Sequence, residues 1–541
     1  MTPPPVAATD AKTMAEAKSV SESVGVDSLR EEATKSLQYT EVEHALTFWA
    51  AIRKHYPAVL WSLFINLATV LKGMDGGIVG SLIGLDPFKR QYGYLYKDDT
   101  YVVAAHWLSA FNYANKLGAV AGAFAAGFAY DRLGPRPLMA LCSLCSIAFI
   151  FVQFFSATPA QLFAGELLNG CIIAFYPICA SSFVGEVCPL ALRGFAASMT
   201  NLAFVIGQFI ASGVLKGTNG IDSKYAYKIP IATQWALPAV MLALIVFCPD
   251  PPFWLCKKRR YADAERSIVR LAAAGVDPSL KLAHIRETLR LEEAFKLDNK
   301  TQLLDCFRGP NLRRLTISVM AYCMQAFTGN LLFIDYAVLF FELAGLDSSN
   351  AFSMNLGLTA IGFTGTCLSW WLLQYVGRRT AYLWGCAALA VVCFVIGAVD
   401  LAPRATTGPA WAQCTLILVC NLVYDVTIGP YCFVLLAEVS SARLRGMTVA
   451  LATVMCNVVS IVFSVAIPYA INEDQGNWRG KLGFLFAGLS GLCYLYCFFC
   501  MPETKDRTFE ELDIMFERRV SSRKFKAYEI NGAIAANEEL H

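Results

Sequence analysis

The chain has 541 residues, of which 56% are hydrophobic and 16% are charged, and its formal net charge is +3. This composition is too apolar for a soluble globular protein and indicates a chain that lies mostly in a lipid bilayer. The small net charge, without a basic block, gives no indication of a nucleic-acid partner.

The N-terminal segment differs from the rest of the chain. Residues 1–55 are polar and rich in Ala, Ser, Glu and Lys. They lack the apolar core and the small-residue cleavage site of a signal peptide. We therefore expect a disordered tail before the first spanning helix.

Twelve apolar segments follow, and each is long enough to cross a bilayer, which takes about 20 helical residues. They lie at 57–83, 101–129, 138–156, 161–187, 195–216, 230–250, 315–344, 351–376, 380–401, 411–438, 447–471 and 480–501. Within the polar stretch at 251–314, helical periodicity with mixed charge predicts short surface helices. The sequence thus predicts an all-α membrane protein with bundles at 56–250 and 315–501, a central loop at 251–314 and a charged tail at 502–541.

The two halves share a repeated motif. EVCPLALRG at 186–194 and EVSSARLRG at 438–446 have the same pattern, and each lies between two apolar segments. DRLGPR at 131–136 and VGRR at 376–379 precede the two copies by two helices. The repetition indicates two similar six-helix halves, as in many membrane carriers.

The repeated motif also predicts two ion pairs. Its Glu and Arg lie at the membrane boundary and can pair across a tight turn, Glu186 with Arg193 and Glu438 with Arg445. These loops, and those at Arg136 and Arg378, are basic. The positive-inside rule therefore places them, and both termini, in the cytosol.

Ionisable residues inside the predicted spans are candidates for function, because they are costly in a bilayer. Lys72 and Asp75 are three residues apart on one helical face and can pair, and Glu166 lies near the outer end of the fourth span. One interpretation is a structural ion pair with Glu166 at an interface. The other is a proton site, at which a carboxyl facing a wet cavity loads a proton outside and releases it inside. The membrane potential then supplies about 2.3 kcal/mol per charge per 100 mV.

A neutral solute such as a sugar needs amides, hydroxyls and an aromatic wall, and the spans contain such groups. We expect the substrate-binding residues to be Asn201, Gln325, Thr328, Asn330, Tyr424, Phe433 and Asn457. Singly, each of these side chains could instead link two helices.

Enzymatic chemistry has no support in the sequence. No nucleophile–base pair, phosphate loop or metal-ligand set occurs at a usable spacing, so we expect no enzyme activity, cofactor or metal. Most of the 19 Cys lie in apolar segments, where Cys behaves as a small hydrophobic residue. The two CxxC pairs, Cys142 with Cys145 and Cys497 with Cys500, have no His nearby.

From about Tyr56 to Leu512 the chain resembles the sugar porter branch of the major facilitator superfamily. The matching segments are Gly73-Met74-Asp75, DRLGPR, EVCPLALRG, PDPPFWL with RRYADA, QAFTGN, VGRR, EVSSARLRG and Pro502-Glu503-Thr504-Lys505. Within this branch, SFVGEVCPLALRGFAASMTNLAFVIGQFIASGVLKG, IPIATQWALP and NWRGKLGFLFAG are similar to fungal α-glucoside proton symporters of the maltose type.

The resemblance implies the major facilitator fold, with twelve transmembrane helices in two pseudo-symmetric bundles that work by alternating access, as a monomer. It implies proton coupling at Asp75 and Glu166 and substrate contacts at Asn201, Gln325, Asn330 and Asn457. It also implies a cytosolic gate formed by Arg136, Glu186, Arg193, Arg378, Glu438 and Arg445. We expect a proton-coupled sugar or α-glucoside importer in a fungal plasma membrane, with lipids, protons and the solute as partners.

Several residues depart from the family pattern. Lys72 stands where these permeases usually carry a Glu, Met74 replaces a Tyr, and Ala326 replaces a polar residue. In the fourth span, Ile172 and Ile173 replace a Pro-Trp pair. Two alternatives follow, namely a carrier or exporter of a non-sugar metabolite with the same fold, and a non-transporting sugar sensor.

Overall fold

The computed structural model describes residues 34–528, except 37, 40, 44–45, 96–100, 274–276, 297–301, 344, 402–407, 441–443, 472–475, 477, 506 and 508. The expected tail at residues 1–33 lies outside the described residues. The described chain is helical apart from one antiparallel pair of short strands, β1 (Tyr94–Leu95) and β2 (Tyr101–Val102), which pair Tyr94 with Val102 and Leu95 with Tyr101.

Two compact units make up the chain. The smaller comprises Met1–Val59, Glu186–Leu192 and Pro249–Lys300, and the larger comprises Leu60–Gly185, Arg193–Cys248 and Thr301–His541. The expected division into two six-helix bundles with separate boundaries remains a prediction.

The smaller unit contains α11 (Pro252–Lys257), α12 (Tyr261–Leu271) and α13 (Pro278–Lys296). On α12, Ala264, Ile268 and Leu271 are buried at helical spacing, so this face packs into a small core with Trp254 and Ile285. Short helices therefore do form in the polar central stretch, as its periodicity predicts.

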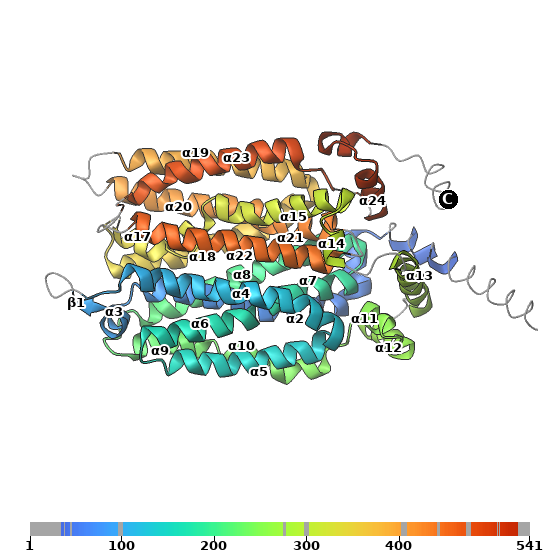
Figure 1. Ribbon diagram of the computed structural model, residues 1–541, viewed down its shortest axis with the longest axis horizontal. Coiled ribbons are helices and arrows are strands. Elements are labelled where there is room, and N and C mark those ends of the chain that lie inside the picture. The colour runs from blue at the N-terminus through green and yellow to red at the C-terminus, as the bar shows by residue number, and fades with distance from the viewer. Residues whose placement is uncertain are drawn as a thin grey trace, which may run out of the picture. The chain divides into compact units, whose positions relative to one another are not determined.

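Long helices form the larger unit, and most run along its length (Figure 1). In the first half they are α2 (Phe48–Leu82), α4 (Ala105–Leu133), α5 (Pro135–Phe154), α6 (Pro159–Ile173), α7 (Phe175–Val187), α8 (Leu190–Thr218), α9 (Tyr225–Thr233) and α10 (Ala236–Leu244), with the short α3 (Asp86–Tyr92) after α2. In the second half they are α15 (Gly309–Phe327), α16 (Asn330–Ile334), α17 (Ala337–Leu343), α18 (Ser348–Tyr375), α19 (Arg378–Val399), α20 (Gly408–Val426), α21 (Ile428–Val439), α22 (Arg445–Ile471) and α23 (Leu482–Cys500), with the short α14 (Gln302–Asp305) before α15.

Ten helical stretches of the described chain are long and apolar enough to cross a membrane. The two other predicted spans correspond to α4, which packs on α6 and α22, and to the broken α15–α16–α17 segment, whose α15 packs on α21 and α22. Each of the twelve predicted segments therefore coincides with one helix or one broken helix.

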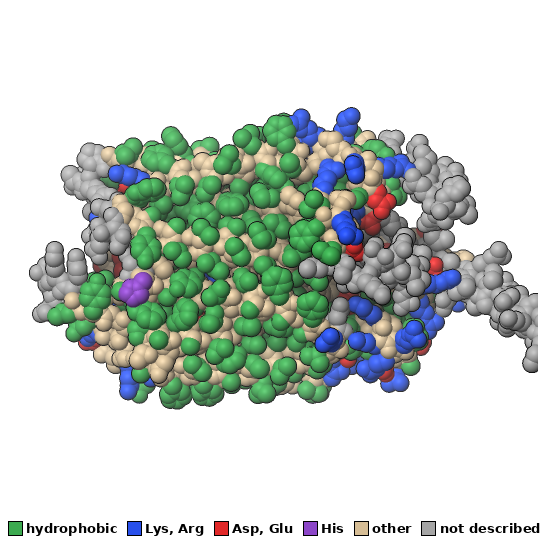
Figure 2. All heavy atoms as spheres, in the orientation of Figure 1, with side chains coloured by type: hydrophobic (Ala, Val, Ile, Leu, Met, Phe, Trp, Pro, Cys, Tyr) green, Lys and Arg blue, Asp and Glu red, His purple; other side chains and the backbone are tan. Residues whose placement is uncertain are grey.

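The outward surface of these helices is apolar. Figure 2 shows hydrophobic side chains along their length and Lys and Arg gathered toward the helix ends. Phe128 on α4, Val391 on α19 and Leu492 on α23 are each more than 60% exposed. A surface of this kind requires hydrocarbon around it, because large contiguous apolar patches are rare in water. The chain is a multi-pass membrane protein.

Close packing of α2 on α8 positions the first candidate site. A Cβ on Gly73 would collide with the Phe204 carbonyl, and one on Gly207 with the Val70 carbonyl. Small residues allow helix backbones in a membrane to touch in this way. The contact places the residues that flank Gly73 directly beside α8.

The span predicted as one helix at 315–344 is broken, which corrects the expectation of a continuous helix. Gly329 has φ +90°, which residues with a side chain rarely adopt, and it separates α15 from α16. A second break lies between α16 and α17. Broken backbone at membrane depth is tolerated where protein surrounds it, and it commonly marks a transport site.

The C-terminal segment forms ordered structure beyond α23. α24 (Phe509–Glu517) and the 3-10 turn η4 (Ser522–Ala527) bury Met515, Phe516 and Phe525 completely. Arg313 on α15 donates to the Val520 carbonyl at 2.7 Å, and Arg314 pairs with Asp513 at 2.5 Å. The charged tail therefore packs against the start of α15 as far as Tyr528.

Candidate substrate and proton site

A cavity of about 790 Å³, counting its mouth, lies inside the larger unit. It is bounded by α7 and α8 of the first half and by α15, α21 and α22 of the second. Its lining combines hydroxyl groups with aromatic faces and small apolar residues: Pro177, Ile178, Ser181, Ser182, Val184, Gly185, Ala197, Thr200, Tyr322, Phe433, Leu436, Ala437, Gly446, Val449 and Thr453. Hydroxyls and rings on a mostly apolar wall suit a polar, uncharged ring such as a sugar.

The cavity lies near the end of the bundle where α7 ends and α8 and α22 begin. At this end the halves still meet between α8 and α18, where the Phe195 and Trp370 rings are 4.7 Å apart. The cavity separates α7 from α21 and α22. We call this end of the bundle, where α7 ends and α8 and α22 begin, the gate end.

At the other end the two halves are in contact, and we call it the closed end. A Cβ on Gly80 of α2 would collide with the Asp335 carbonyl. Asn355 on α18 donates to Ser212 on α8 at 3.1 Å, and Lys216 on α8 donates to the Ser349 carbonyl at 2.7 Å. A solute in the cavity therefore meets packed helices in the direction of this end.

Asp75 on α2 is fully buried and is held by two amides. Asn169 on α6 donates to its Oδ1 at 3.0 Å, and Asn115 on α4 donates to its Oδ2. Ser146 on α5 in turn donates to Asn169 Oδ1 at 3.0 Å, which orients the amide. The predicted carboxyl thus lies at the centre of a polar network that joins four helices.

Glu166 on α6 is also buried, with 3% of its surface exposed. Within the described part of the chain its Oε2 has no hydrogen-bond partner, and its carboxyl interacts electrostatically with that of Asp75. The structure therefore brings these two predicted acids together.

The expected ion pair between Lys72 and Asp75 is not formed among the described residues. Lys72 Nζ instead lies 5.5 Å from the centre of the Phe204 ring on α8. The three-residue spacing puts both Cβ atoms on one face of α2, but the long side chain turns toward α8 while the short one turns toward α4 and α6.

Asn201, a predicted substrate residue, joins the two halves. It donates to Thr366 Oγ1 on α18 at 3.1 Å and lies 3.4 Å from Asp425 Oδ1 on α20. Asp425 is 2% exposed. In this state the Asn201 side-chain amide is therefore bonded to protein groups.

The other predicted substrate residues differ in their surroundings. Phe433 lines the cavity, and the buried Gln325 Nε2 has no acceptor in the described part of the chain. Asn330 is the first residue of α16 and is partly exposed. Thr328 and Asn457 donate to backbone carbonyls of their own helices, at Met324 and Thr453. Tyr424 is buried beside Gly429.

Sequence reasoning missed Lys116, a lysine in the middle of the second span. Its Nζ is 2.7 Å from Asp335 Oδ2 and 2.8 Å from Ser464 Oγ on α22. The rule that a charge inside a span is a functional candidate applies to Lys116 as much as to Lys72, so this signal was available.

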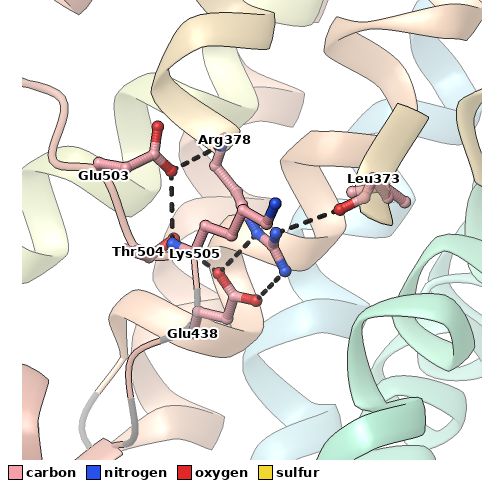
Figure 3. A network of polar contacts seen from close by, with 6 residues as sticks. All are labelled: Leu373, Arg378, Glu438, Glu503, Thr504 and Lys505. Atoms are coloured by element: carbon pink, nitrogen blue, oxygen red, sulfur yellow. Dashed lines mark hydrogen bonds and ion pairs between the residues drawn. The ribbon is translucent and has the colours of Figure 1, made fainter. Parts of the chain in front are cut away.

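At the gate end, Arg378 binds Glu438 through two nitrogens (Figure 3). Nη2 is 2.9 Å from Oε1 and Nε is 3.2 Å from Oε2. Thr504 donates to Glu438 Oε2 at 2.6 Å, and the Arg378 backbone N–H donates to Glu503 at 2.7 Å. Bidentate, charge-assisted hydrogen bonds of this kind are among the strongest that side chains make.

The predicted gating pairs are otherwise placed as follows. The side chains of Arg193 and Arg445 lie outside the described residues, so the pairs Glu186–Arg193 and Glu438–Arg445 remain predictions. Glu438 forms its ion pair with Arg378. In the smaller unit, Glu186 accepts from the Trp254 backbone N–H at 3.2 Å. Arg136 donates to the Val246 carbonyl.

A helical membrane fold with a cavity between two similar halves defines a membrane transport protein. The family described as "Sugar (and other) transporter" matches residues 61–516, and the chain belongs to this family. Alpha-glucosides permease MPH3 of Saccharomyces cerevisiae is 31% identical over 507 residues, which cover 92% of this chain and 83% of that protein. Maltose permease MAL31 of the same species is 30% identical over 519 residues, which cover 94% and 84%.

Solved structures show the same fold. The MFS (major facilitator superfamily) proton:xylose symporter XylE bound to 6-bromo-6-deoxy-D-glucose superposes with a TM-score of 0.70 at 20% identity, over 85% of this chain and 99% of that chain. The inward-open xylose transporter XylE from E. coli superposes with a TM-score of 0.64 at 18% identity, over 85% and 99%. The expected all-α major facilitator fold is confirmed.

Proposed function

We propose that the protein is a proton-coupled importer of a sugar of the α-glucoside class, which works by alternating access in the plasma membrane as a monomer. The names of the yeast relatives and the hydroxyl and aromatic lining of the cavity support this substrate class. A carrier of a non-sugar metabolite has no specific observation in its favour.

The observation that carries proton coupling is the network around Asp75. Its carboxyl is buried at membrane depth between two amide donors, next to the second buried carboxyl of Glu166. Because such groups are costly in a bilayer, their presence at this depth supports a role in transport. In the proposed cycle, Asp75 and Glu166 take up a proton when they face the outside and release it when they face the cytosol.

Coupling of the proton to the solute runs through α2 and α8. Asp75 is two residues from Gly73, which touches the Phe204 backbone, and Thr200, one turn earlier on α8, lines the cavity. A change at Asp75 that shifts α2 therefore shifts a wall of the cavity.

Orientation follows from the positive-inside rule, which puts the basic loops and both termini in the cytosol. The cavity then faces the cytosol and the closed end faces the outside. We propose that the structure is an inward-facing state. At the gate end the Arg378–Glu438 pair links α19 to α21 within the second half, and Asn201 bonds groups of α18 and α20. The contacts of Gly80, Asn355 and Lys216 hold the outer end closed.

The test is uptake of radiolabelled maltose by yeast that lacks its own hexose and maltose carriers, with the external pH recorded. We expect uptake with alkalinisation of the medium, and loss of accumulation in Glu166→Gln. Glu265→Gln on the exposed face of α12 is the control and keeps full uptake. Absence of alkalinisation with any saccharide, or unchanged accumulation in Glu166→Gln, contradicts the proposal.

A further inference from the structure

Two lysines lie inside the larger unit at membrane depth, and their surroundings differ. Lys72 and Lys116 are both in electrostatic range of the Cys456 thiol on α22. Lys116 is neutralised by Asp335 and bonded to Ser464. Lys72 has no carboxylate within 4 Å among the described residues, and its ammonium lies over the ring of Phe204. In the described part of the chain, Lys72 therefore forms no close ion pair, although Asp75 interacts with it electrostatically from a greater distance.

The nearest acid on the same helix, Asp75, interacts with Lys72 electrostatically but does not form a direct ion pair with it. Both oxygens of Asp75 are taken by Asn169 and Asn115, on the α4 and α6 side of α2. Lys72 points the other way, toward α8 and α22, which belong to different halves. The ammonium therefore lies at the seam between the halves, whereas the carboxyl lies within the first half.

There is room for a ligand group beside Lys72. Its side chain is partly exposed, although Leu71, Gly73, Met74 and Asp75 around it are buried. Gly76 lies one turn further on the same face of α2, and a Cβ added there would meet nothing within 4 Å. The face of α2 that carries Lys72 and Gly76 therefore has free space beside it, and we call it the open face.

This open face adjoins the cavity. The Phe204 ring under Lys72 stacks on Phe433 with 6.0 Å between ring centres, and Phe433 lines the cavity. Tyr322, another lining residue, packs edge-on against Phe433 at 5.8 Å. Lys72 is therefore linked to the wall of the cavity through two aromatic rings in contact.

Lys72 and the amide nitrogen of Gln325 are both hydrogen-bond donors. Lys72 offers only N–H groups, and the buried Gln325 Nε2 also lacks an acceptor among the described residues. An aromatic face replaces only part of the hydration that an ammonium loses on burial. A carboxylate would accept a charge-assisted hydrogen bond from the ammonium. A neutral hydroxyl would accept only a weaker hydrogen bond.

We infer that the transported saccharide carries a carboxylate, and that Lys72 binds this group. The inference rests on the proposed transport of a saccharide and narrows its class to acidic sugars, such as a glycoside of a sugar acid. Lys72 is then a specificity residue that selects an anionic over a neutral cargo.

The test compares maltose with maltobionate, the same α-glucoside with its reducing end oxidised to a carboxylate, in proteoliposomes at one pH. We expect wild-type kcat/KM for maltobionate to exceed that for maltose at least tenfold, which corresponds to about 1.4 kcal/mol. Lys72→Gln should lower this ratio at least tenfold. Lys72→Arg keeps the charge and should retain most of the preference.

Folding is checked by the gel-filtration profile and the melting temperature of each variant. If Lys72→Gln does not fold, inhibition of labelled maltose uptake by the wild-type protein is measured with unlabelled maltobionate and with unlabelled maltose. Stronger inhibition by maltobionate than by maltose supports the inference. Uptake of maltose but not of maltobionate overturns the inference and leaves the proposed function standing. An acid preference that persists in Lys72→Gln also overturns it. Failure of both saccharides to bind or move overturns the proposed function as well.

Discussion

Lys116 on α4 and Asp335, between α16 and α17, form an ion pair of 2.7 Å across 219 residues of chain. The pair joins the first half of the chain to the second, and Ser464 on α22 adds a hydrogen bond from the same ammonium. Asp335 is also the residue whose backbone meets Gly80 at the closed end. Any movement that opens this end therefore has to separate a mostly buried pair of opposite charges.

Lys116→Gln is expected to destabilise the inward-facing state, because it leaves the Asp335 carboxylate without its cation. Removing one partner of a buried pair costs about 3 kcal/mol, at the lower end of the usual range. The double variant Lys116→Gln, Asp335→Asn removes both charges and should recover most of the loss. Thermal unfolding in detergent measures the two single variants, Lys116→Gln and Asp335→Asn, and the double variant. A double variant whose loss equals the sum of the single losses would show that the two charges do not interact.

Asp75→Asn is expected to abolish proton-driven accumulation while solute exchange continues. An amide has no site for the transported proton, but it is similar in size and can still bond Asn169 and Asn115 after one of them reorients. Uptake by the variant should not change with external pH, whereas wild-type uptake should rise as the pH falls. Counterflow of labelled maltose measures exchange. Retained accumulation in Asp75→Asn would leave Glu166 as the sole proton carrier.

Arg378→Lys is expected to weaken the gate, because a single ammonium cannot bridge both oxygens of Glu438. The loss of one hydrogen bond to a charged group is worth about 1.5–3 kcal/mol. Arg379→Lys is the matched control, since this neighbour bonds only the Phe498 carbonyl among the described residues. The uptake rate and melting temperature should fall for the first variant and stay near wild type for the second. Equal effects in the two variants would remove Arg378 from the gate.

Gly329→Ala is expected to destabilise the break between α15 and α16. At φ +90° a side chain costs about 1–2 kcal/mol, and the added Cβ would lie 3.0 Å from Phe333 and 3.2 Å from Phe486. Gly357→Ala on α18 is the control, because nothing lies within 4 Å of its added Cβ. The melting temperature should fall only for Gly329→Ala. An unchanged value would mean that the break does not need a left-handed residue.

Truncation before Phe509 is expected to lower stability, because it removes the buried Met515, Phe516 and Phe525 from the bundle. It also deprives Arg314 of Asp513. Truncation after Tyr528 keeps all these contacts and serves as the control. Melting temperatures of the purified proteins compare the two, and a similar value for both truncations would show that the segment adds nothing to the fold.

The sequence was sufficient for the spans and for the family. A hydrocarbon environment demands about twenty apolar residues per crossing and leaves no alternative to a helix, so every predicted segment coincides with a helix or a broken helix. The interior acids Asp75 and Glu166 were visible for the same reason, since charge is rare at that depth. Short surface helices such as α12 followed from periodicity alone.

Pairings between side chains depended on the tertiary structure. Lys72 and Asp75 are neighbours in sequence, yet close packing at Gly73 leaves Asp75 with the amides of α4 and α6 and turns Lys72 toward Phe204. Glu438 binds Arg378 at the start of α19, on a different helix, and neither motif by itself indicates this contact. Lys116 finds its counter-charge 219 residues further along the chain. Hydropathy acts locally and sets which segments enter the membrane, whereas the partner of each charge depends on which helices pack together, and that depends on contacts distant in sequence.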